Sequence, residues 1–213
     1  MSMIDIIWPF YKDYTYLNKC INNINKQSLL PKNLIFIDDG NLDTKLKTYL
    51  KKKLKKKIKL IYIKNKKNIG PEKSLEKSFK YIKSKFFYIK SSDDDIKKNF
   101  LKENIFILKK NRSAPYVFSN IKINNTINNT KYELDFPFIR KGYSSPLNIK
   151  EIYIKHQFKI YHNTVVFNSN LFLKENLFSN YYGYRCDMLN LQFLGLKYGF
   201  LYLDKYLSEF TVR

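Results

Sequence analysis

Short apolar runs alternate with helical patterns through the first 95 residues, and this alternation is the feature that most constrains the fold. Four runs have the composition of buried strands, at residues 4–8, 34–37, 58–63 and 86–89. Helical spacing of apolar residues marks the stretches between them, at residues 14–27, about 42–57 and 71–82. Repeated strand–helix–strand units favour parallel strands with right-handed crossovers. We therefore expect an α/β fold with a mixed, mainly parallel central sheet flanked by helices.

Acidic residues follow two of the strand-like runs. Asp38 and Asp39 close the second run, and Ser91-Ser92-Asp93-Asp94-Asp95 follows the fourth. Ligands bind beyond the carboxyl ends of strands in open α/β sheets, so both acidic ends are expected at one site. Adjacent carboxylates raise one another's pKa, and a divalent cation would neutralise them. The alternative is a helix cap, because Asp is favoured at helix starts and residues 96–110 are predicted to be helical.

The composition indicates a folded and strongly basic domain. Of the 213 residues, 44% are hydrophobic and 17% aromatic, which excludes a disordered chain and suits one large domain. The 40 Lys and Arg residues outnumber 18 Asp and Glu residues, so nucleic acid, an anionic membrane and an anionic substrate are candidate partners. The alternative is that lysines, which occur in nearly every segment, fill solvated positions. Nucleic acid is the weaker hypothesis, because the sequence has no stacking motif or reader signature.

The two cysteines and the hydrophobic pattern bear on location. Cys20 and Cys186 lie far apart and match no metal spacing or disulfide framework, which favours a reducing compartment. No apolar run approaches the roughly 20 residues of a membrane span, and the amino terminus has no signal-peptide pattern. The sequence predicts a cytoplasmic protein, with peripheral contact to a membrane left open.

Five short motifs occur in a characteristic order. They are Pro9-Phe10-Tyr11, Gln27, Ile37-Asp38-Asp39-Gly40, Asn68-Ile69-Gly70 and the acidic cluster at Asp93. In order and spacing they resemble the amino-terminal half of a family 2 glycosyltransferase with the GT-A fold, and the resemblance covers residues 3–121. It implies one Rossmann-like GT-A domain over residues 1–213. Residues 1–121 would bind the nucleotide sugar, and residues 122–213 would bind the acceptor and supply the base.

The resemblance implies a pocket for a nucleoside diphosphate sugar, with a UDP-sugar as the first choice. The positions that match the family's pocket are Pro9, Tyr11, Asp38, Asp39, Gly70 and Asp93. Tyr11 is expected to stack on the base, and Asp38 or Asp39 to accept hydrogen bonds from base or ribose. Near the diphosphate the family usually has an Arg where this chain has Leu75, and Lys73 is the nearby cation.

The resemblance also implies a Mn²⁺ or Mg²⁺ ion that neutralises charge on the leaving diphosphate. The family's metal motif is Asp-x-Asp followed by another Asp. Ungapped spacing puts Ser91 on the first position, Asp93 on the second and Asp94 on the next residue. If the frame shifts, Asp93-Asp94-Asp95 is itself the Asp-x-Asp. Asp93 is the direct ligand in both frames, and Asp94 and Asp95 are the further candidates.

The second half of the chain is less regular. Residues 121–161 lose periodicity and are expected to form a surface loop that includes acceptor-binding structure. Strand character returns at residues 161–167, and a last strand is expected at residues 200–203. Acceptor recognition is therefore the least legible property of the sequence.

A helix is expected after Tyr184-Arg185-Cys186-Asp187. The resemblance implies that Asp187 is the general base on the acceptor hydroxyl, with Cys186 where the family usually has Glu. The helix dipole keeps such a carboxylate ionised. The alternative is an N-cap. His162, and with less support His156, is a further candidate to bind the metal or the diphosphate.

Together these features predict a metal-dependent, inverting glycosyltransferase. It would move a sugar from a nucleotide-diphosphate sugar to a hydroxyl of a glycan, lipid or protein-linked acceptor. The alternative is a basic nucleic-acid-binding module or a non-catalytic sugar-nucleotide-binding module. A nucleotidyltransferase would need a Gly-rich phosphate loop near the first strand, which is lacking. The sequence fits a minimal enzyme or the catalytic domain of a longer protein.

Overall fold

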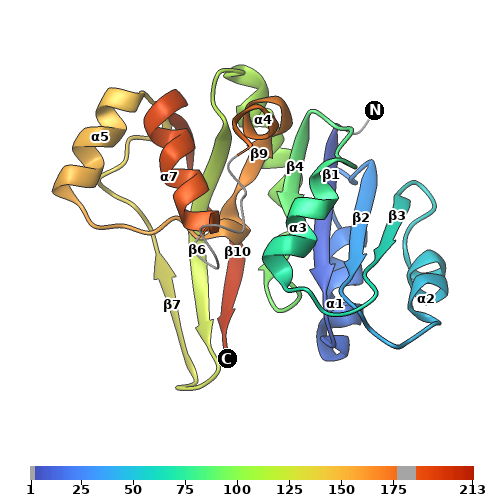
Figure 1. The fold of residues 1–213 in the computed structure, drawn as a ribbon. Helices are drawn as coiled ribbons and strands as arrows, with labels where there is room; N and C mark the ends of the chain where they lie inside the picture. The colour runs from blue at the N-terminus through green and yellow to red at the C-terminus, as the bar shows by residue number, and fades with distance from the viewer. Residues whose placement is uncertain (1–2, 177–185) are drawn as a thin grey trace.

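The computed structural model describes residues 3–176 and 186–213, which form helices around one ten-stranded sheet (Figure 1). The amino-terminal elements are β1 (Ile4–Phe10), α1 (Tyr14–Asn25), β2 (Asn33–Asp38), α2 (Leu46–Lys53), β3 (Lys59–Lys64), α3 (Pro71–Phe79), β4 (Phe86–Ile89), β5 (Asp95–Ile96) and α4 (Phe100–Lys110). The later elements are β6 (Tyr116–Asn125), β7 (Thr130–Leu134), β8 (Gly142–Ser144), α5 (Pro146–Lys155), the 3-10 helix η1 (His162–Thr164), β9 (Val166–Asn168), α6 (Ser169–Glu175), α7 (Cys186–Tyr198) and β10 (Phe200–Val212). The predicted α/β fold with a mainly parallel sheet is confirmed.

The amino-terminal half is a parallel sheet covered on both faces. Its strands lie in the order β3-β2-β1-β4, and every neighbouring pair is parallel. Side chains alternate along β1, so Ile6 and Trp8 enter one core cluster and Ile7 enters the other. All residues of β2 and β4 are buried, as expected for strands between two helical layers.

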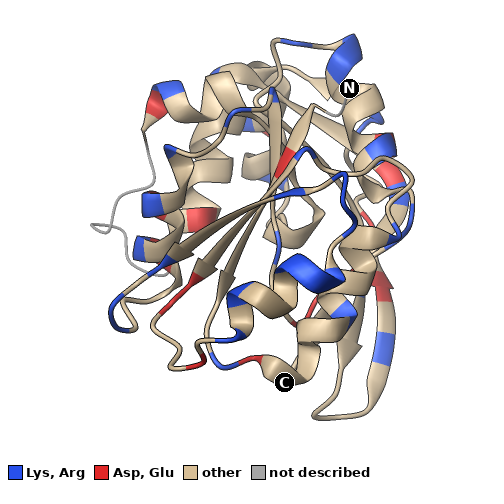
Figure 2. Ribbon diagram, turned by 90° about the vertical axis from the view of Figure 1, so that its right-hand side faces the viewer, with Lys and Arg blue, Asp and Glu red and all other residues tan. Residues whose placement is uncertain are grey.

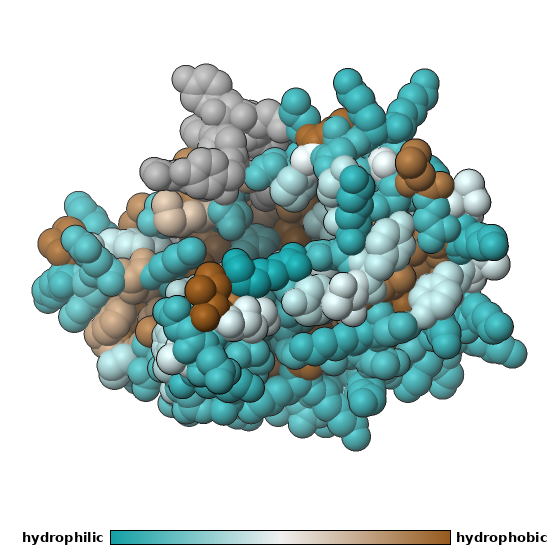
Figure 3. All heavy atoms as spheres, turned by 90° about the horizontal axis from the view of Figure 1, so that it is seen from below, coloured by the Kyte–Doolittle hydropathy of each residue, from teal (hydrophilic) through white to brown (hydrophobic). Residues whose placement is uncertain are grey.

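The second half adds one antiparallel strand to the middle of the sheet. β9 pairs antiparallel with both β4 and β6, and β10 pairs parallel with β6. The carboxyl ends of β1–β4, β6 and β10 therefore share the edge of the sheet that carries the C-terminus (Figure 1). The site is expected at this edge, which Figure 3 views face-on and which is largely hydrophilic.

The predicted irregular loop at residues 121–161 is wrong over much of its length. β6 continues to Asn125 and forms a hairpin with β7, whose side chains are mainly exposed. Exposure on both faces removes the alternation of apolar and polar residues by which a strand is recognised in a sequence. α5 begins at Pro146 and is capped by the Ser145 hydroxyl. The last strand is also longer than expected, since β10 runs to Val212.

Three other predicted boundaries need correction. α2 covers only residues 46–53 of the expected 42–57. The expected strand at residues 161–167 is η1 followed by the short strand β9. α4 begins at Phe100 with Asn99 as its N-cap, because Asp95 and Ile96 pair with β10 instead. The helix-cap alternative for the acidic cluster is therefore wrong.

In residues 3–176 and 186–213, no helix combines the length and apolar character that crossing a bilayer requires.

Candidate active site

Asp38, at the end of β2, is fully buried and bound within the protein. Its Oδ1 accepts hydrogen bonds from the Asn41 backbone N–H at 2.9 Å and from the Asn41 side chain at 2.7 Å. Its Oδ2 accepts from the Tyr62 hydroxyl at 2.5 Å and lies 3.9 Å from Lys64 Nζ. The carboxylate therefore fastens the loop after β2 to the neighbouring strand β3.

Asp39 organises the Asn-Ile-Gly turn. Its Oδ1 accepts hydrogen bonds from Asn65 Nδ2 at 2.8 Å and from the Ile69 N–H at 3.0 Å. Its Oδ2 accepts from the Gly70 N–H at 3.0 Å, and Gly70 has a φ of +88°, in the region that favours glycine. A carboxylate can accept about four hydrogen bonds, so Asp39 keeps capacity for one more. The turn leads into α3, which begins with Pro71.

Tyr11 lies beside this turn. Its side chain is 40% exposed, and hydrogen bonding to the Asn68 side chain lowers its pKa, an effect that the Asp39 charge opposes. Pro9 is paired with Ile37 inside β1 and does not belong to a loop. The structure therefore brings Tyr11, Asp39 and Gly70 together, while Asp38 and Pro9 lie in the framework behind them.

The amino terminus of α3 faces the same edge. Gly70 is its N-cap, and Lys73 is exposed in its first turn. The first backbone N–H groups of a helix attract anions, and the nearby ammonium group adds to that attraction. Lys77 is held further along by a 2.9 Å hydrogen bond from its Nζ to Asn65 Oδ1.

The three aspartates of the acidic cluster point in different directions. Asp93 Oδ2 pairs with Arg213 Nε at 2.9 Å. Asp94 is buried, and its Oδ1 accepts a hydrogen bond from the Thr211 N–H at 3.1 Å. Asp95 turns toward α1, where Lys19 Nζ and Asn23 Nδ2 each lie 2.6 Å from it.

The acidic cluster can supply one ligand to a metal ion but not a complete coordination shell. In the described parts of the chain, no three His, Cys, Asp or Glu side chains are gathered as a metal centre would need. The residues therefore do not fit an ion held by all three aspartates. They do fit an ion held by one carboxylate together with substrate phosphates, which is a common arrangement for Mg²⁺. Asp93 is the candidate, because only one of its oxygens is committed to Arg213.

Residues that the sequence motifs did not single out hold the acidic loop. Lys90 is fully buried, and its ammonium group donates to the Ser91 carbonyl at 2.6 Å and to the Asp94 carbonyl. The Trp8 indole N–H donates to Ser92 Oγ at 3.0 Å. The position of Lys90, directly after a four-residue apolar strand, could have indicated from the sequence that this lysine is buried. The role of Arg213 depends on strand pairing and left no local signal.

Asp187 lies at the amino terminus of α7, as predicted. Its Oδ1 accepts a hydrogen bond from the Met188 N–H at 2.7 Å, and Cys186 beside it is buried. Burial, together with the charges of Asp187 and Glu72, raises the pKa of the Cys186 thiol to about 11. Glu72 belongs to the first turn of α3, so the amino termini of α3 and α7 lie near each other. Tyr184 and Arg185 of the predicted motif lie outside the described residues.

The two histidines have different surroundings. Burial lowers the pKa of His162, and the Asp187 charge opposes this effect, so His162 lies close to the predicted base. His156 stacks on Phe138 with ring centroids 4.3 Å apart, in the region of α5. His162 therefore belongs to the candidate site, whereas His156 packs on Phe138 at the carboxyl end of α5.

Comparison with known proteins adds a family and a fold. The family model described as glycosyl transferase family 2 matches residues 5–172. The structure of S. aureus TarS 1-349 has a TM-score of 0.76 at 21% identity, covering 99% of this chain and 60% of that one. TarS 1-349 in complex with UDP and in complex with UDP-GlcNAc give TM-scores of 0.72 and 0.73 at 21% and 20% identity. No curated protein matches the sequence significantly.

These similarities carry different weight. Both ligand-bound comparisons match the whole of this chain. The matched region is only 61% of the TarS chain in the UDP complex and 59% in the UDP-GlcNAc complex. At this level of identity the TarS structures establish a shared fold alone. The family match, in contrast, extends over most of the sequence and contains β2–β4, the acidic loop and all of β1 except Ile4. The chain belongs to glycosyl transferase family 2 and has the GT-A fold, as its motifs predict.

Proposed function

We propose that this chain transfers a sugar from a UDP-sugar to a hydroxyl group of a glycan, lipid or protein-linked acceptor. The observation that carries the proposal is the Asp39–Gly70 contact, which sets the amino terminus of α3 beside the exposed ring of Tyr11. Family membership supports glycosyl transfer. The UDP and UDP-GlcNAc complexes of TarS, which shares the fold, support the choice of donor.

The donor site is assigned as follows. Tyr11 stacks on the base, and Asp39 uses its remaining acceptor capacity for a base or ribose hydrogen bond. The amino terminus of α3 and Lys73 bind the diphosphate. Asp38 and Pro9 contribute by holding the ends of β1 and β2 in place. Residues 1–121 are thus the donor half of one GT-A domain, and residues 122–213 are the acceptor half.

Asp187 is the proposed general base. The acceptor oxygen forms a bond to the anomeric carbon while the bond from that carbon to the diphosphate oxygen breaks, and Asp187 takes the hydroxyl proton. This single displacement inverts the anomeric configuration. The hydrogen bond from the Met188 N–H holds the Asp187 carboxylate at the amino terminus of α7. Desolvation lowers the pKa of His162 and so favours its neutral form, while the Asp187 charge opposes this effect.

Asp93 is the proposed ligand of a Mn²⁺ or Mg²⁺ ion, which would neutralise charge on the leaving diphosphate when it is bound. Asp94 and Asp95 act differently in this proposal. They order the loop through Thr211 and through Lys19 and Asn23. The site is then complete only when the diphosphate supplies its own oxygens.

The donor assignment is tested by thermal unfolding with a panel of UDP, GDP, dTDP and CDP, each with and without Mn²⁺. A ligand that binds only the folded state raises the midpoint, and UDP with Mn²⁺ is expected to raise it most. If no nucleotide shifts the midpoint, the donor site is wrongly assigned. The Asp187→Asn variant should keep the UDP shift and lose transfer. A variant that still turns over would remove Asp187 as the base.

A further inference from the structure

One edge of the molecule carries an unusual concentration of lysine. Twelve of the 36 lysines lie between residues 45 and 67, and this stretch contains no Asp or Glu. All twelve are exposed. We call this set the lysine edge: Lys45, Lys47, Lys51, Lys52, Lys53, Lys55, Lys56, Lys57, Lys59, Lys64, Lys66 and Lys67. Figure 2 looks onto this side of the molecule, where Lys and Arg positions gather over α2 and β3.

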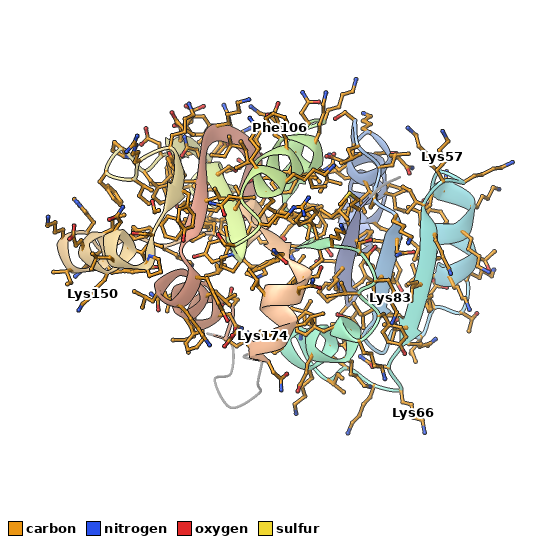
Figure 4. All side chains as sticks on the ribbon, turned by 90° about the horizontal axis from the view of Figure 1, so that it is seen from above. Lys57, Lys66, Lys83, Phe106, Lys150 and Lys174 are labelled. Atoms are coloured by element: carbon orange, nitrogen blue, oxygen red, sulfur yellow. The ribbon has the colours of Figure 1, made fainter. Side chains whose placement is uncertain are left out.

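The charge of the lysine edge is barely neutralised by the protein. Among the described residues, Lys64 is the one member with a carboxylate within 4 Å, at 3.9 Å from Asp38. Lys47 and Lys53 lie over the rings of Tyr62 and Tyr49, each at 5.8 Å. Lys57 and Lys66, labelled in Figure 4, point away from the molecule. A single-sign cluster of this kind destabilises the folded state by repulsion, so a partner that neutralises it would bind favourably.

Protection of the sheet edge explains only a small part of this charge. β3 is the outermost strand on its side, and Lys59 and Lys64 at its two ends discourage pairing with another strand. Eight of the other members lie on α2 and in the turns around it, and Lys66 and Lys67 lie in the loop between β3 and α3. The apolar residues of α2 and the turn after it, including Leu50 and Leu54, are buried, so the lysines form the outer surface there.

Two further observations point to the chemistry of the partner. Leu42, just before the lysine edge, is 95% exposed. The rings of the two tyrosines of the edge are already engaged: Lys53 lies over the Tyr49 ring, and Tyr62 stacks on Phe36. Binding of single-stranded nucleic acid relies on free aromatic faces, which are lacking on this edge. Basic clusters beside an exposed apolar side chain are typical of binding to anionic membranes.

We propose that the lysine edge docks the protein on an anionic lipid bilayer, with Leu42 entering the head-group layer. Lysine ammonium groups neutralise lipid phosphates, and the leucine adds apolar burial. The surface lies beside the candidate site: a Cβ on Gly40 would be 2.4 Å from the backbone of Lys67 and Asn68, so the two loops touch. The docking itself is independent of the proposed function. Its consequence, a bilayer next to the mouth of the donor site, rests on that function.

The test is co-sedimentation of the full chain with vesicles of phosphatidylcholine mixed with phosphatidylglycerol, and with pure phosphatidylcholine. The variant replaces Lys51, Lys52, Lys55 and Lys56 with Gln. Its matched control replaces four exposed lysines around α4, which are Lys98, Lys102, Lys109 and Lys110, with Gln. Each lysine at the surface contributes about fivefold to partitioning, so the variant should lose about 30-fold or more if half of its sites touch the bilayer. The control should change less than about threefold, and Leu42→Ser should lose about tenfold.

Three results would overturn the proposal. The wild type could fail to sediment with anionic vesicles, or the two lysine variants could lose binding equally. Single-stranded DNA could also bind more tightly than the vesicles and depend on the same four lysines, which would make the edge a nucleic-acid surface. All variants are expected to keep the thermal shift with UDP and Mn²⁺. Failure of that shift in the wild type would count against the donor site and not against the docking surface.

Discussion

Replacement of Asp39 by Asn tests how the candidate donor site is built. The Asp39 carboxylate is buried and accepts three hydrogen bonds, from Asn65, Ile69 and Gly70. Asn keeps the shape of the side chain but has only one oxygen. That oxygen can keep the bonds to Asn65 and Ile69, and the amide NH₂ group then faces the Gly70 N–H, so two donors oppose each other. The turn before α3 therefore keeps its Ile69 bond to residue 39 but loses the Gly70 bond.

The magnitude follows from the contacts that change. One charge-assisted hydrogen bond disappears, which costs about 1.5–3 kcal/mol, and the two that remain lose the charge of their acceptor. The expected decrease in unfolding free energy is about 2–4 kcal/mol. For a protein of this size, it corresponds to a fall of roughly 5–12 °C in the unfolding midpoint.

The assay is thermal unfolding of the variant with and without UDP and Mn²⁺. Asp43→Asn is the matched control, because Asp43 lies in the same loop but is exposed and accepts one hydrogen bond from the Lys45 N–H. Its midpoint should stay within about 1–2 °C of the wild type. If Asp39→Asn is as stable as Asp43→Asn and keeps the full UDP shift, Asp39 does not organise the site.

Two other predictions concern stability. Gly195→Ala should lower the free energy of unfolding, measured in urea, by about 1–3 kcal/mol, because the new Cβ would lie 2.9 Å from the buried Tyr116 hydroxyl. Gly→Ala usually stabilises a helix, so a stabilised variant would contradict this packing. Burial lowers the pKa of His162 below its ordinary 6.5, so the unfolded state takes up the proton first, and the stability contribution is full above pH 6.5 and is lost as the pH falls below it. Urea unfolding of the wild type should therefore weaken relative to His162→Phe across that range, and parallel pH profiles would show that the imidazole is not buried as described.

The parallel half of the fold was predictable because its signals are local. β2 and β4 lie between two helical layers, so they are apolar on both faces except for the polar residues at the two ends of β2. A short continuous apolar run was therefore sufficient to identify each strand. The turn at Gly70 was equally clear, since Pro71 starts the helix there. Strand order and the shared carboxyl edge then followed from general rules of connection.

The carboxylates show where such reasoning stops. Asp38 and Asp39 are adjacent in the sequence and were indistinguishable there, yet only Asp39 contacts the turn. The difference depends on Tyr62, which reaches Asp38 from the neighbouring strand. Similarly, three consecutive aspartates suggested a shared metal, but β5 pairs with β10 and turns Asp95 toward α1. Contacts between distant segments decide which carboxylates remain available.

The second half was the least predictable. β7 is mainly exposed, so no hydrophobic period marked it, and β10 continues past Asp204 and Lys205 through irregular pairing with β6. Such a strand is held by its neighbour and not by its own composition. The position of Asp187 was nevertheless correct, because a carboxylate in the first turn of a helix has a local signature.

The most direct test of the donor site is calorimetric titration of UDP, with Mn²⁺ present, into the wild type, Tyr11→Ala and Tyr14→Ala. The two tyrosines are 40% and 41% exposed, but only Tyr11 lies beside the Asn-Ile-Gly turn, whereas Tyr14 packs against Phe10. A base that stacks on Tyr11 gains about 1–3 kcal/mol, so Tyr11→Ala should weaken UDP binding by at least about fivefold. Tyr14→Ala should leave the dissociation constant within about twofold of the wild type. Equal binding by all three proteins, or no binding by the wild type, would contradict the assignment of a nucleotide-sugar site to this edge of the sheet.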